Sequence, residues 1–330
     1  MKKRSVGLGL ELVASFSIAI LILAICIVPS SLGAGYPEAP ITMVVPYGPG
    51  GVDRDIRAMA PTLGKILGQP LVIENRAGAG SSIGTYYVVQ AKPDGYTLLF
   101  AAGTALNLVP LMTDLPYKFD DLIPIASTSS QIQMLAVSAN TPWKTVRDLI
   151  EYGKKNPVKI GISGFGTSVH ICGEILAHAS NIKFAFVPYK SIMEAITAVI
   201  GGHIEGVISM PQTVIPQVKG GKLRVITVFS SERFPFLSEA PTIKEAGIPF
   251  EMEAGKTWFG IFAPKGTPPP ICDKWSEAVR KAINDKEVLS SFEKMATIAE
   301  FQNQKEFKAS LEKQLAMYQR VIDKMGLKKK

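Results

Sequence analysis

The chain has 330 residues and a formal net charge of +8 at pH 7. Its basic residues are scattered rather than gathered in a stripe, apart from the terminal Lys328, Lys329 and Lys330, so a nucleic-acid partner is not expected. The positive excess leaves open an attraction to an acidic ligand or to a membrane surface.

Residues 1–35 have the pattern of a secretory signal peptide. A basic start (MKKR) precedes an apolar run over residues 13–28 and a stretch of small residues at 30–35. An uncleaved anchor is the rival interpretation, but the run falls short of the roughly 20 apolar residues that span a bilayer comfortably. Lipidation at Cys26 is disfavoured, because Ile25 stands where lipoprotein signals have a small residue. We therefore expect a periplasmic protein with a cleaved signal.

The part that follows the signal, about 295 residues, is long for one core and suits two domains. Its two cysteines, Cys172 and Cys272, match no metal or CxxC spacing. A disulfide between them stays open at this stage. Cys172 falls on the apolar face of a predicted helix, so we expect a buried free thiol.

Apolar runs alternate with helical periodicity from residue 41 onward, which predicts an α/β protein. The first lobe is expected to contain a parallel sheet, with strands at 41–45, 71–73 and 96–102 and helices at 56–67 and 83–91.

The same alternation restarts beyond residue 140 and predicts a second lobe of the same class. Thr141 and Pro142 have the pattern of a helix start. Residues 191–194 (SIME) read as a capping box for a helix that ends at Gly201. A further helix is expected from Ser168, and strands at 158–162, 184–187, 207–209 and 223–229.

The C-terminal part has too few predicted strands for a third lobe. It contains a strand at 258–263 and helices at 271–283 and 305–325, which we expect to return to the first lobe. The chain would then cross between lobes near 136–140 and 258–262. The predicted lobes are residues 36–138 with 262–330, and residues 139–261.

Two glycine-rich loops lie at strand-to-helix junctions of the first lobe, at residues 46–53 and 74–84. Glycine lets backbone N–H groups approach a ligand, and a helix N-terminus favours an anion. Each loop alone could be a tight turn, but the pair favours binding. A nucleotide is disfavoured, because the glycines are spaced GxGxxxG and no acidic residue ends a strand about 20 residues later.

A third loop, residues 161–170, contains Ser163 and His170, which could form a nucleophile and base. Phe165 occupies the place of the last glycine of a nucleophile elbow, so ligand-binding hydroxyls are the preferred interpretation. His170, Glu174 and His178 share a helix face, but the two histidines would be about 12 Å apart along the axis, too far to ligate one ion. We expect no metal and no cofactor.

Six ordered motifs in this chain resemble those of the substrate-binding proteins of tripartite tricarboxylate transporters, the Bug receptors. The motifs are residues 44–51 (VVPYGPGG), 74–80 (ENRAGAG), 93–99 (PDGYTLL), 187–190 (VPYK), 241–247 (PTIKEAG) and 263–268 (APKGTP). The resemblance covers nearly all of the chain after the signal.

The resemblance implies a type II periplasmic-binding-protein fold, with two doubly wound α/β lobes joined by two crossing segments. It implies a monomer that binds a small carboxylate in the interlobe cleft, performs no catalysis and works with membrane transporter subunits. Two departures from the family pattern, a shortened loop before Asp53 and Ser191 in place of glycine, leave the identity of the ligand open. Carried over by motif, the ligand-binding residues are Tyr47, Pro49, Gly50, Asp53, Ala79, Gly80, Ser81, Ser163, Gly166, Thr167, Ser168, His170 and Tyr189.

Two other classes of function stay open on the sequence alone. A secreted serine-dependent hydrolase would use Ser163, Ser168 and His170. A ligand-sensing receptor without transport would share the fold, although the signal sequence and the lack of a DNA-binding motif argue against a transcription regulator.

Overall fold

The computed structural model describes residues 35–50 and 52–327. Residues 1–36 form one unit and residues 37–330 another, and the description below concerns the second. The predicted signal peptide therefore lies outside the described residues, except for Gly35. Among the described helices, none is long and apolar enough to cross a membrane.

The first sheet has the strand order β11-β4-β10-β3-β1-β2. β1 pairs in parallel with β2 and β3, whereas β10 is antiparallel to both β3 and β4. The three strands predicted from the sequence, β1, β2 and β3, are therefore parallel as expected. The sheet as a whole is mixed, because β10 enters from the other half of the chain in the opposite direction. The strands are β1 (Ile41–Val45), β2 (Leu71–Asn75), β3 (Thr97–Ala102), β4 (Leu122–Ile132), β10 (Lys256–Pro264) and β11 (Ile298–Gln302).

The helices around this sheet are amphipathic and bury one face. α2 buries Ile56, Met59 and Leu63, and it ends at Gly68, whose φ of 80° suits glycine. The helices of this half are α2 (Asp53–Leu67), α3 (Ser82–Val89), α4 (Thr104–Asn107), α5 (Val109–Met112), α10 (Pro269–Ala282), α11 (Lys286–Lys294) and α12 (Gln304–Met325), with short 3₁₀ turns η1 (Ala79–Ser81), η2 (Phe119–Asp121) and η3 (Met252–Gly255).

The second sheet has the order β7-β6-β8-β5-β9. β6 is parallel to β7 and β8, and β5 is antiparallel to β8 and β9. The strands are β5 (Met134–Ser138), β6 (Val158–Ile162), β7 (Phe184–Pro188), β8 (Gly206–Ser209) and β9 (Leu223–Val228), and the helices are α6 (Val146–Gly153), α7 (Ser168–Ala179), α8 (Ile192–Ile200) and α9 (Pro211–Lys219).

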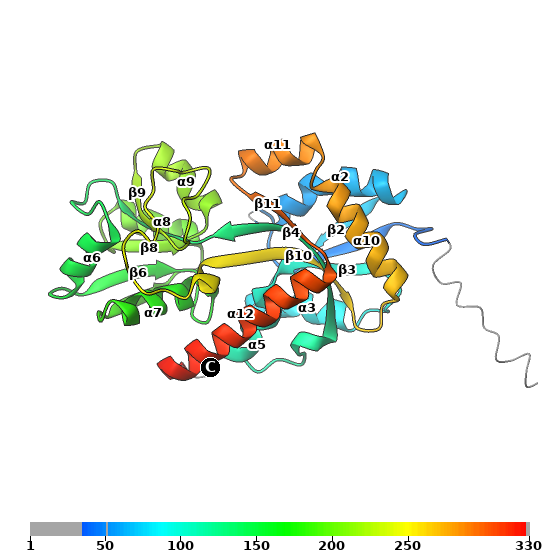
Figure 1. The fold of residues 1–330 in the computed structure, drawn as a ribbon, viewed down its shortest axis with the longest axis horizontal. Coiled ribbons are helices and arrows are strands. Elements are labelled where there is room, and N and C mark those ends of the chain that lie inside the picture. Colours follow the sequence, from blue (N-terminus) through cyan, green and yellow to red (C-terminus); the bar gives the residue numbers. More distant parts are fainter. Residues whose placement is uncertain (1–34, 51, 328–330) are drawn as a thin grey trace, which may run out of the picture. The chain divides into compact units, whose positions relative to one another are not determined.

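Both sheets share one topology. The order β2-β1-β3-β10-β4 repeats as β7-β6-β8-β5-β9, and in each sheet the fourth strand is antiparallel and arrives from the other half of the chain (Figure 1). The two halves are therefore α/β units of the type II periplasmic-binding-protein fold, and we refer to them as the first and second lobes. Loop 46–52 after β1 has its counterpart in loop 163–167 after β6.

The crossings between the sheets lie earlier in the chain than expected. Residues 134–138 belong to the second sheet and residues 256–261 to the first, the reverse of our sequence prediction. Both segments are largely buried strands, β5 directly after β4 and the first part of β10, so the sequence pattern did not indicate which sheet they join. The chain crosses from one sheet to the other at Gln133 and again at Gly255. The N–H of Gln133 donates a hydrogen bond to the carbonyl oxygen of Gly255 at 2.9 Å. We propose these two residues as the lobe boundaries.

The start of α6 also differs from the prediction. The helix begins at Val146, not at Thr141, because Thr145 and Asp148 form a capping box. Thr141 instead donates its hydroxyl to the carbonyl of Ser138 in a turn.

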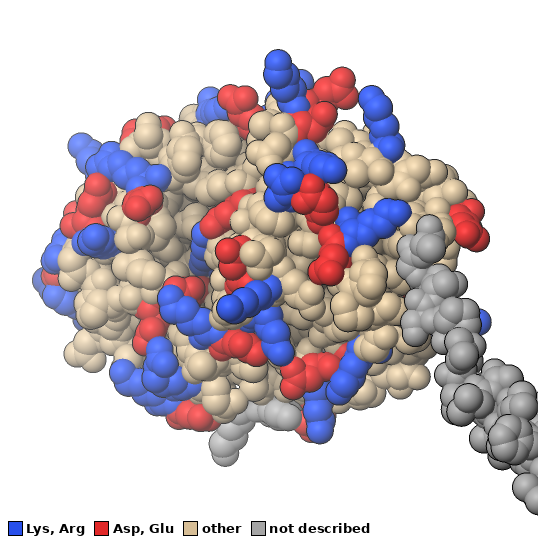
Figure 2. Space-filling view, turned by 45° about the vertical axis from the view of Figure 1, so that its right-hand side comes forward, with Lys and Arg blue, Asp and Glu red and all other residues tan. Residues whose placement is uncertain are grey.

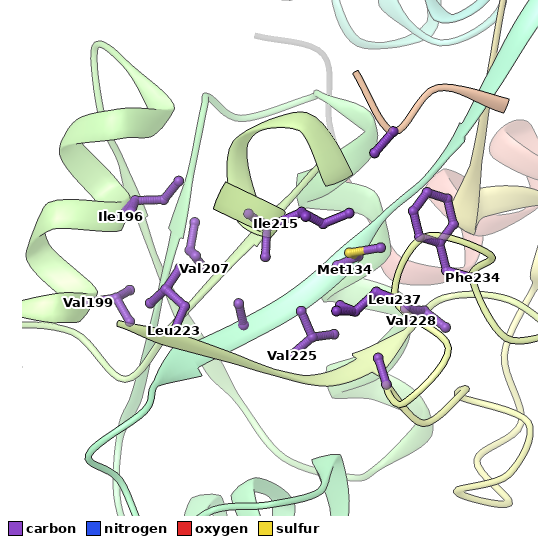
Figure 3. Packing of buried hydrophobic residues seen from close by; sticks show 14 of the residues in the cluster. Met134, Ile196, Val199, Val207, Ile215, Leu223, Val225, Val228, Phe234 and Leu237 are labelled. Atoms are coloured by element: carbon purple, nitrogen blue, oxygen red, sulfur yellow. The ribbon is translucent and has the colours of Figure 1, made fainter. Parts of the chain in front are cut away.

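The second lobe has a core on the face of its sheet that α8 and α9 cover. Phe234 and Leu237, from the irregular segment after β9, complete this core (Figure 3). The core residues labelled in that figure are Met134, Ile196, Val199, Val207, Ile215, Leu223, Val225, Val228, Phe234 and Leu237.

Helix α12 packs on both lobes, whereas the sequence predicted packing on the first lobe. Phe307 and Leu311, in its first half, join the core of the first lobe. Tyr318 and neighbouring residues of its second half pack with Ile171 and Ile175 of α7. The C-terminal helix therefore links the lobes on one side.

Charged side chains of both signs are interspersed on the face shown in Figure 2. Ion pairs such as Lys313 with Glu253 and Arg320 with Glu251 join α12 to the segment before β10. Pairs this exposed stabilise a fold by at most about 1 kcal/mol each, so the packing described above carries the stability.

Candidate functional site

A cavity of about 370 Å³ lies where loops of the two lobes meet. Gly166 of the second lobe lies against the first lobe, because a Cβ placed on it would be 3.1 Å from the Cβ of Met112. The cavity is lined by Pro46, Tyr47, Gly48, Val52, Ala77, Gly78, Gly80, Ser81, Ala102, Thr104, Leu108, Val109, Gly166, Thr167, Ser168, Met210 and Phe259.

The described residues that line this cavity include no Lys, Arg, His, Asp or Glu. The polar groups are the hydroxyls of Tyr47, Ser81, Thr104, Thr167 and Ser168, together with backbone N–H groups. The helices α2, α3 and α7 all begin at the cavity, and each N-terminus carries a partial positive charge. An anion suits such a site without any cationic side chain.

The loop before α3 has an unusual backbone. Ala79, Gly80 and Ser81 have φ values of 44°, 65° and 86°, so three successive residues adopt left-handed conformations. Such conformations are strained for alanine and serine, and strain of this kind gathers at functional sites. Hydrogen bonds from Ser82 to the carbonyl of Ala79 and from Thr85 to that of Ser81 hold the loop in place.

Tyr47 provides a neutral hydroxyl in the lining of the cavity. Its Oη accepts the N–H of Ala102 at 3.2 Å, and burial raises the pKa of Tyr47 to about 12. The phenol therefore keeps its proton at neutral pH and can donate a hydrogen bond. Asn75 holds the same loop from below by donating to the carbonyl oxygen of Tyr47 at 2.9 Å.

Comparison with known proteins assigns this architecture to a family. A profile of the tripartite tricarboxylate transporter family receptor, TctC, matches residues 56–327. The chain belongs to the TctC receptor family. BugT of Bordetella pertussis is 34% identical to it over 263 residues, which cover 78% of this chain and 80% of BugT. A protein encoded in the gbd 5' region of Cupriavidus necator is 33% identical over 298 residues, covering 89% and 90% of the two chains.

Solved structures of TctC-type proteins have the same fold. The periplasmic binding protein BugD is 28% identical with a TM-score of 0.78, over 89% of this chain and all of BugD. A Rhodopseudomonas palustris protein solved with adipate is 26% identical (TM-score 0.80, 88% and 98% covered). MatC from the same organism, solved with malate, is 25% identical (TM-score 0.75, 87% and 100% covered). Members of the TctC family are solute-binding receptors rather than enzymes.

Six of the predicted contact residues come together in the wall of this TctC-type cavity. Tyr47, Gly80 and Ser81 come from the first lobe, and Gly166, Thr167 and Ser168 from the second. Thr167 also caps α7: its hydroxyl donates to the carbonyl of Gly164 and accepts the N–H of His170.

Asp53 is not among the residues that line the cavity. The residue is 1% exposed, and its carboxylate accepts a hydrogen bond from Arg57 Nε at 2.8 Å. Arg57 Nη2 donates in turn to Asn75 Oδ1 at 2.7 Å, and Asn75 holds Tyr47. Asp53 thus supports the loop of the first lobe, and a direct ligand contact from it stays a prediction.

Five further predicted residues lie outside the lining. Pro49, Gly50, Ala79 and Ser163 are exposed on their loops. Tyr189 is half-buried and packs against the core of the second lobe. A direct ligand contact from each of these positions stays a prediction.

His170 is 4% exposed and lies one layer behind loop 163–167. Its Nδ1 accepts the N–H of Gly166 at 3.2 Å, and its Nε2 is 3.2 Å from Glu174 Oε1. Both ring nitrogens are therefore engaged. A base for Ser163 or Ser168 would need a free nitrogen, so this arrangement disfavours the hydrolase.

Several lining residues were not predicted from the sequence. Thr104, Leu108 and Val109 follow β3, so the rule that ligands lie beyond the carboxyl ends of parallel strands could have found them. Met210 directly follows β8, which is parallel to β6, so the same rule applies to it. Phe259 carries no such signal, because it lies within a strand whose place in the first sheet was not evident from the sequence.

Cys172 and Cys272 are free and buried, so the expectation of a buried thiol is confirmed for Cys172. The Cys172 thiol contacts the carbonyl of Ala254 at 3.4 Å, and burial raises its pKa. The described residues contain no group of three or more His, Cys, Asp or Glu placed to hold a metal ion.

Four hollows with larger volumes lie away from these loops. Two of them, of about 720 and 880 Å³, are beside α2 and β2 and beside the C-terminal end of α7. The other two, of about 400 and 440 Å³, are beside β9 and beside α11. None of the four is lined by the N-termini of several described helices. The smaller interlobe cavity is therefore the candidate site.

Proposed function

We propose that this chain is an extracytoplasmic receptor that captures a small dicarboxylate between its lobes and delivers it to a tripartite tricarboxylate-type membrane transporter. The observation that carries the proposal is the uncharged cavity lined by loops of both lobes at three helix N-termini. Malate and adipate, bound by the two Rhodopseudomonas palustris proteins, are both dicarboxylates of a size that such a cavity accepts.

Backbone N–H groups would hold one carboxylate. Loop 79–81 has a left-handed backbone, and concave backbone segments with free N–H groups bind anions. The Ser81 N–H is not one of these donors, because it donates to the carbonyl of Gly78 at 3.1 Å. Hydroxyls of Ser81, Thr167 and Ser168 would add donors from both lobes. A ligand held by both lobes at once stabilises the closed arrangement of the lobes, because its contacts are complete only there.

Release without chemistry follows from the same geometry. The receptor would return its ligand unchanged, since His170 has no free nitrogen to act as a base. We further propose that the mature protein is a periplasmic monomer freed by cleavage near residues 31–35, which N-terminal sequencing of the exported protein would establish.

The test is calorimetry on the purified protein with malate, succinate and adipate, and with adipamide as a neutral control of similar length. We expect a dicarboxylate to bind and to raise the melting temperature, because a ligand of the folded state stabilises it by RT ln(1 + [L]/Kd). The ligand recovered afterwards should be chemically unchanged. Equal binding of adipate and adipamide, or recovery of a hydrolysed product, would contradict the proposal.

A further inference from the structure

The imidazole of His170 is fixed on every side. Its ring packs edge-on against Phe165 and Phe186, with centroids 5.2 Å and 4.9 Å away. Its Nδ1 accepts the Gly166 N–H, and its Nε2 faces Glu174 Oε1 at 3.2 Å. Because His170 and Glu174 are one helical turn apart on α7, the helix itself sets their separation.

These contacts specify a tautomer. A nitrogen that accepts a hydrogen bond carries no proton, so Nδ1 is bare and the proton of a neutral ring is on Nε2. Nε2–H then donates to the Glu174 carboxylate. A carboxylate that orients a histidine through its far nitrogen is a recurrent device for fixing both the tautomer and the ring orientation.

Gly166 is the residue that this imidazole controls. It lines the cavity, has a φ of 74°, and has no side chain that could anchor it. Its N–H is committed to His170, so the peptide plane is fixed and the following residues, Thr167 and Ser168, begin α7 at the cavity wall. Without an acceptor behind it, a glycine in a loop samples many conformations.

We propose that His170 is a positioning residue for solute binding: as the Nε2–H tautomer oriented by Glu174, it holds the Gly166 amide and orders the second-lobe half of the site before the solute arrives. This inference rests on the proposed function and adds a requirement. The site needs a hydrogen-bond acceptor at the Nδ1 position, not an imidazole that touches the ligand.

Two amide substitutions separate these requirements. The Oδ1 of asparagine occupies nearly the place of Nδ1, whereas the glutamine amide reaches the place of Nε2. His170→Asn should therefore keep the bond to Gly166, and His170→Gln should lose it. Both remove the ring from Phe165 and Phe186, so the pair is matched for lost packing.

We expect His170→Asn to bind a dicarboxylate with nearly wild-type affinity and His170→Gln to bind roughly tenfold more weakly, as for one lost hydrogen bond. Glu174, which accepts from Nε2–H of His170, gives a second pair of variants. Glu174→Gln keeps an acceptor for this N–H and should bind the dicarboxylate well, whereas Glu174→Leu has no acceptor and should bind it more weakly. Equal affinities of the two His170 variants, or full affinity of Glu174→Leu, would overturn the inference.

A measurement without ligand keeps the inference separate from the proposed function. In ¹⁵N-labelled wild-type protein, the hydrogen bond predicts a scalar coupling between the amide nitrogen of Gly166 and Nδ1 of His170, with the proton found on Nε2. Absence of this coupling overturns the inference even if a variant fails to fold. A wild-type protein that shows the coupling but binds no dicarboxylate would instead overturn the proposed function.

Discussion

At the scale of single residues, Asp55 is the most unusual group away from the cavity. It is 2% exposed in α2 and accepts hydrogen bonds from Ser129 at 3.2 Å and Thr297 at 3.3 Å. Burial raises its pKa from 3.8 to about 7, although these two hydrogen bonds act in the opposite direction. The folded protein therefore holds a proton that the unfolded chain releases at a lower pH.

This pKa shift predicts how stability depends on pH. Below pH 3.8 Asp55 is protonated in both states, and as the pH rises toward 7 only the folded state keeps the proton. The stabilisation is therefore lost as the pH rises through about 7. Asparagine does not titrate, so Asp55→Asn should not lose stability as the pH rises. At pH 8 the variant should unfold at a higher denaturant concentration than wild type, and at pH 5 the difference between the two should be smaller. Urea denaturation at pH 5 and pH 8 tests this prediction. An Asp55→Asn variant that is less stable than wild type at pH 8 would contradict the raised pKa of Asp55.

Gly48 allows a steric test of the cavity that does not strain the backbone. It lines the cavity, its φ is not positive, and a Cβ placed on it would have no atom within 4 Å. Gly48→Val should therefore fold normally but fill space needed by the ligand, lowering affinity about tenfold or more, a free-energy change of about 1.4 kcal/mol per tenfold. Arg54→Ala, on an exposed part of α2, is the control and should keep most of the affinity. Calorimetry that ranked the two variants in the opposite order would indicate an arginine clamp.

At the scale of elements, periodicity located many of the strands and helices whose buried residues are apolar, although it missed β5 and α11. It missed β4, whose buried positions 127–130 are serine and threonine. Their hydroxyls are satisfied by distant partners, for example Ser127 by the carbonyl of Glu300 and Ser130 by its carboxylate. It also missed α9, which contains Pro216. Polar residues buried by long-range hydrogen bonds give no local signal in the sequence.

The crossing between β4 and β5 offers a prediction about stability. Gln133 is fully buried, and both polar atoms of its side chain lack a hydrogen-bond partner among the described residues. Leaving a buried polar group unpaired costs about 1–3 kcal/mol. Gln133→Met, which keeps a similar volume, should therefore raise the free energy of unfolding by about that amount. Chemical denaturation measures the change, and a destabilised Gln133→Met would reveal that the amide is paired.

At the scale of residues 37–327, the two sheets have the same topology, and the fourth strand of each sheet comes from the other half of the chain. This arrangement explains which parts of the site the sequence could predict. Each glycine loop follows a strand of its own lobe, so motif and strand order located Tyr47, Gly80 and Gly166. Phe259 lines the cavity from β10, a strand that joins the first sheet from the other half of the chain, and no local pattern encodes that placement.

The two crossings at Gln133 and Gly255 predict that a dicarboxylate draws the lobes together as a hinge closes. Ile83 and Met193 are exposed, at 55% and 45%, and follow the carboxyl ends of β2 and β7, one in each lobe. Cysteines at these positions can carry spin labels without interference from Cys172 and Cys272, which are buried.

The distance between labels at Ile83→Cys and Met193→Cys should shorten when malate or adipate is added, and it should not change with adipamide. A control pair within the second lobe, Glu151→Cys with Met193→Cys, should keep its distance in every case, because each lobe moves as a unit around its own core. Since α12 packs on both lobes, closure must also slide Tyr318 against α7, a small shear that packed helices permit. An interlobe distance unaffected by a ligand that calorimetry shows to be bound would mean that the lobes are already locked together by this helix.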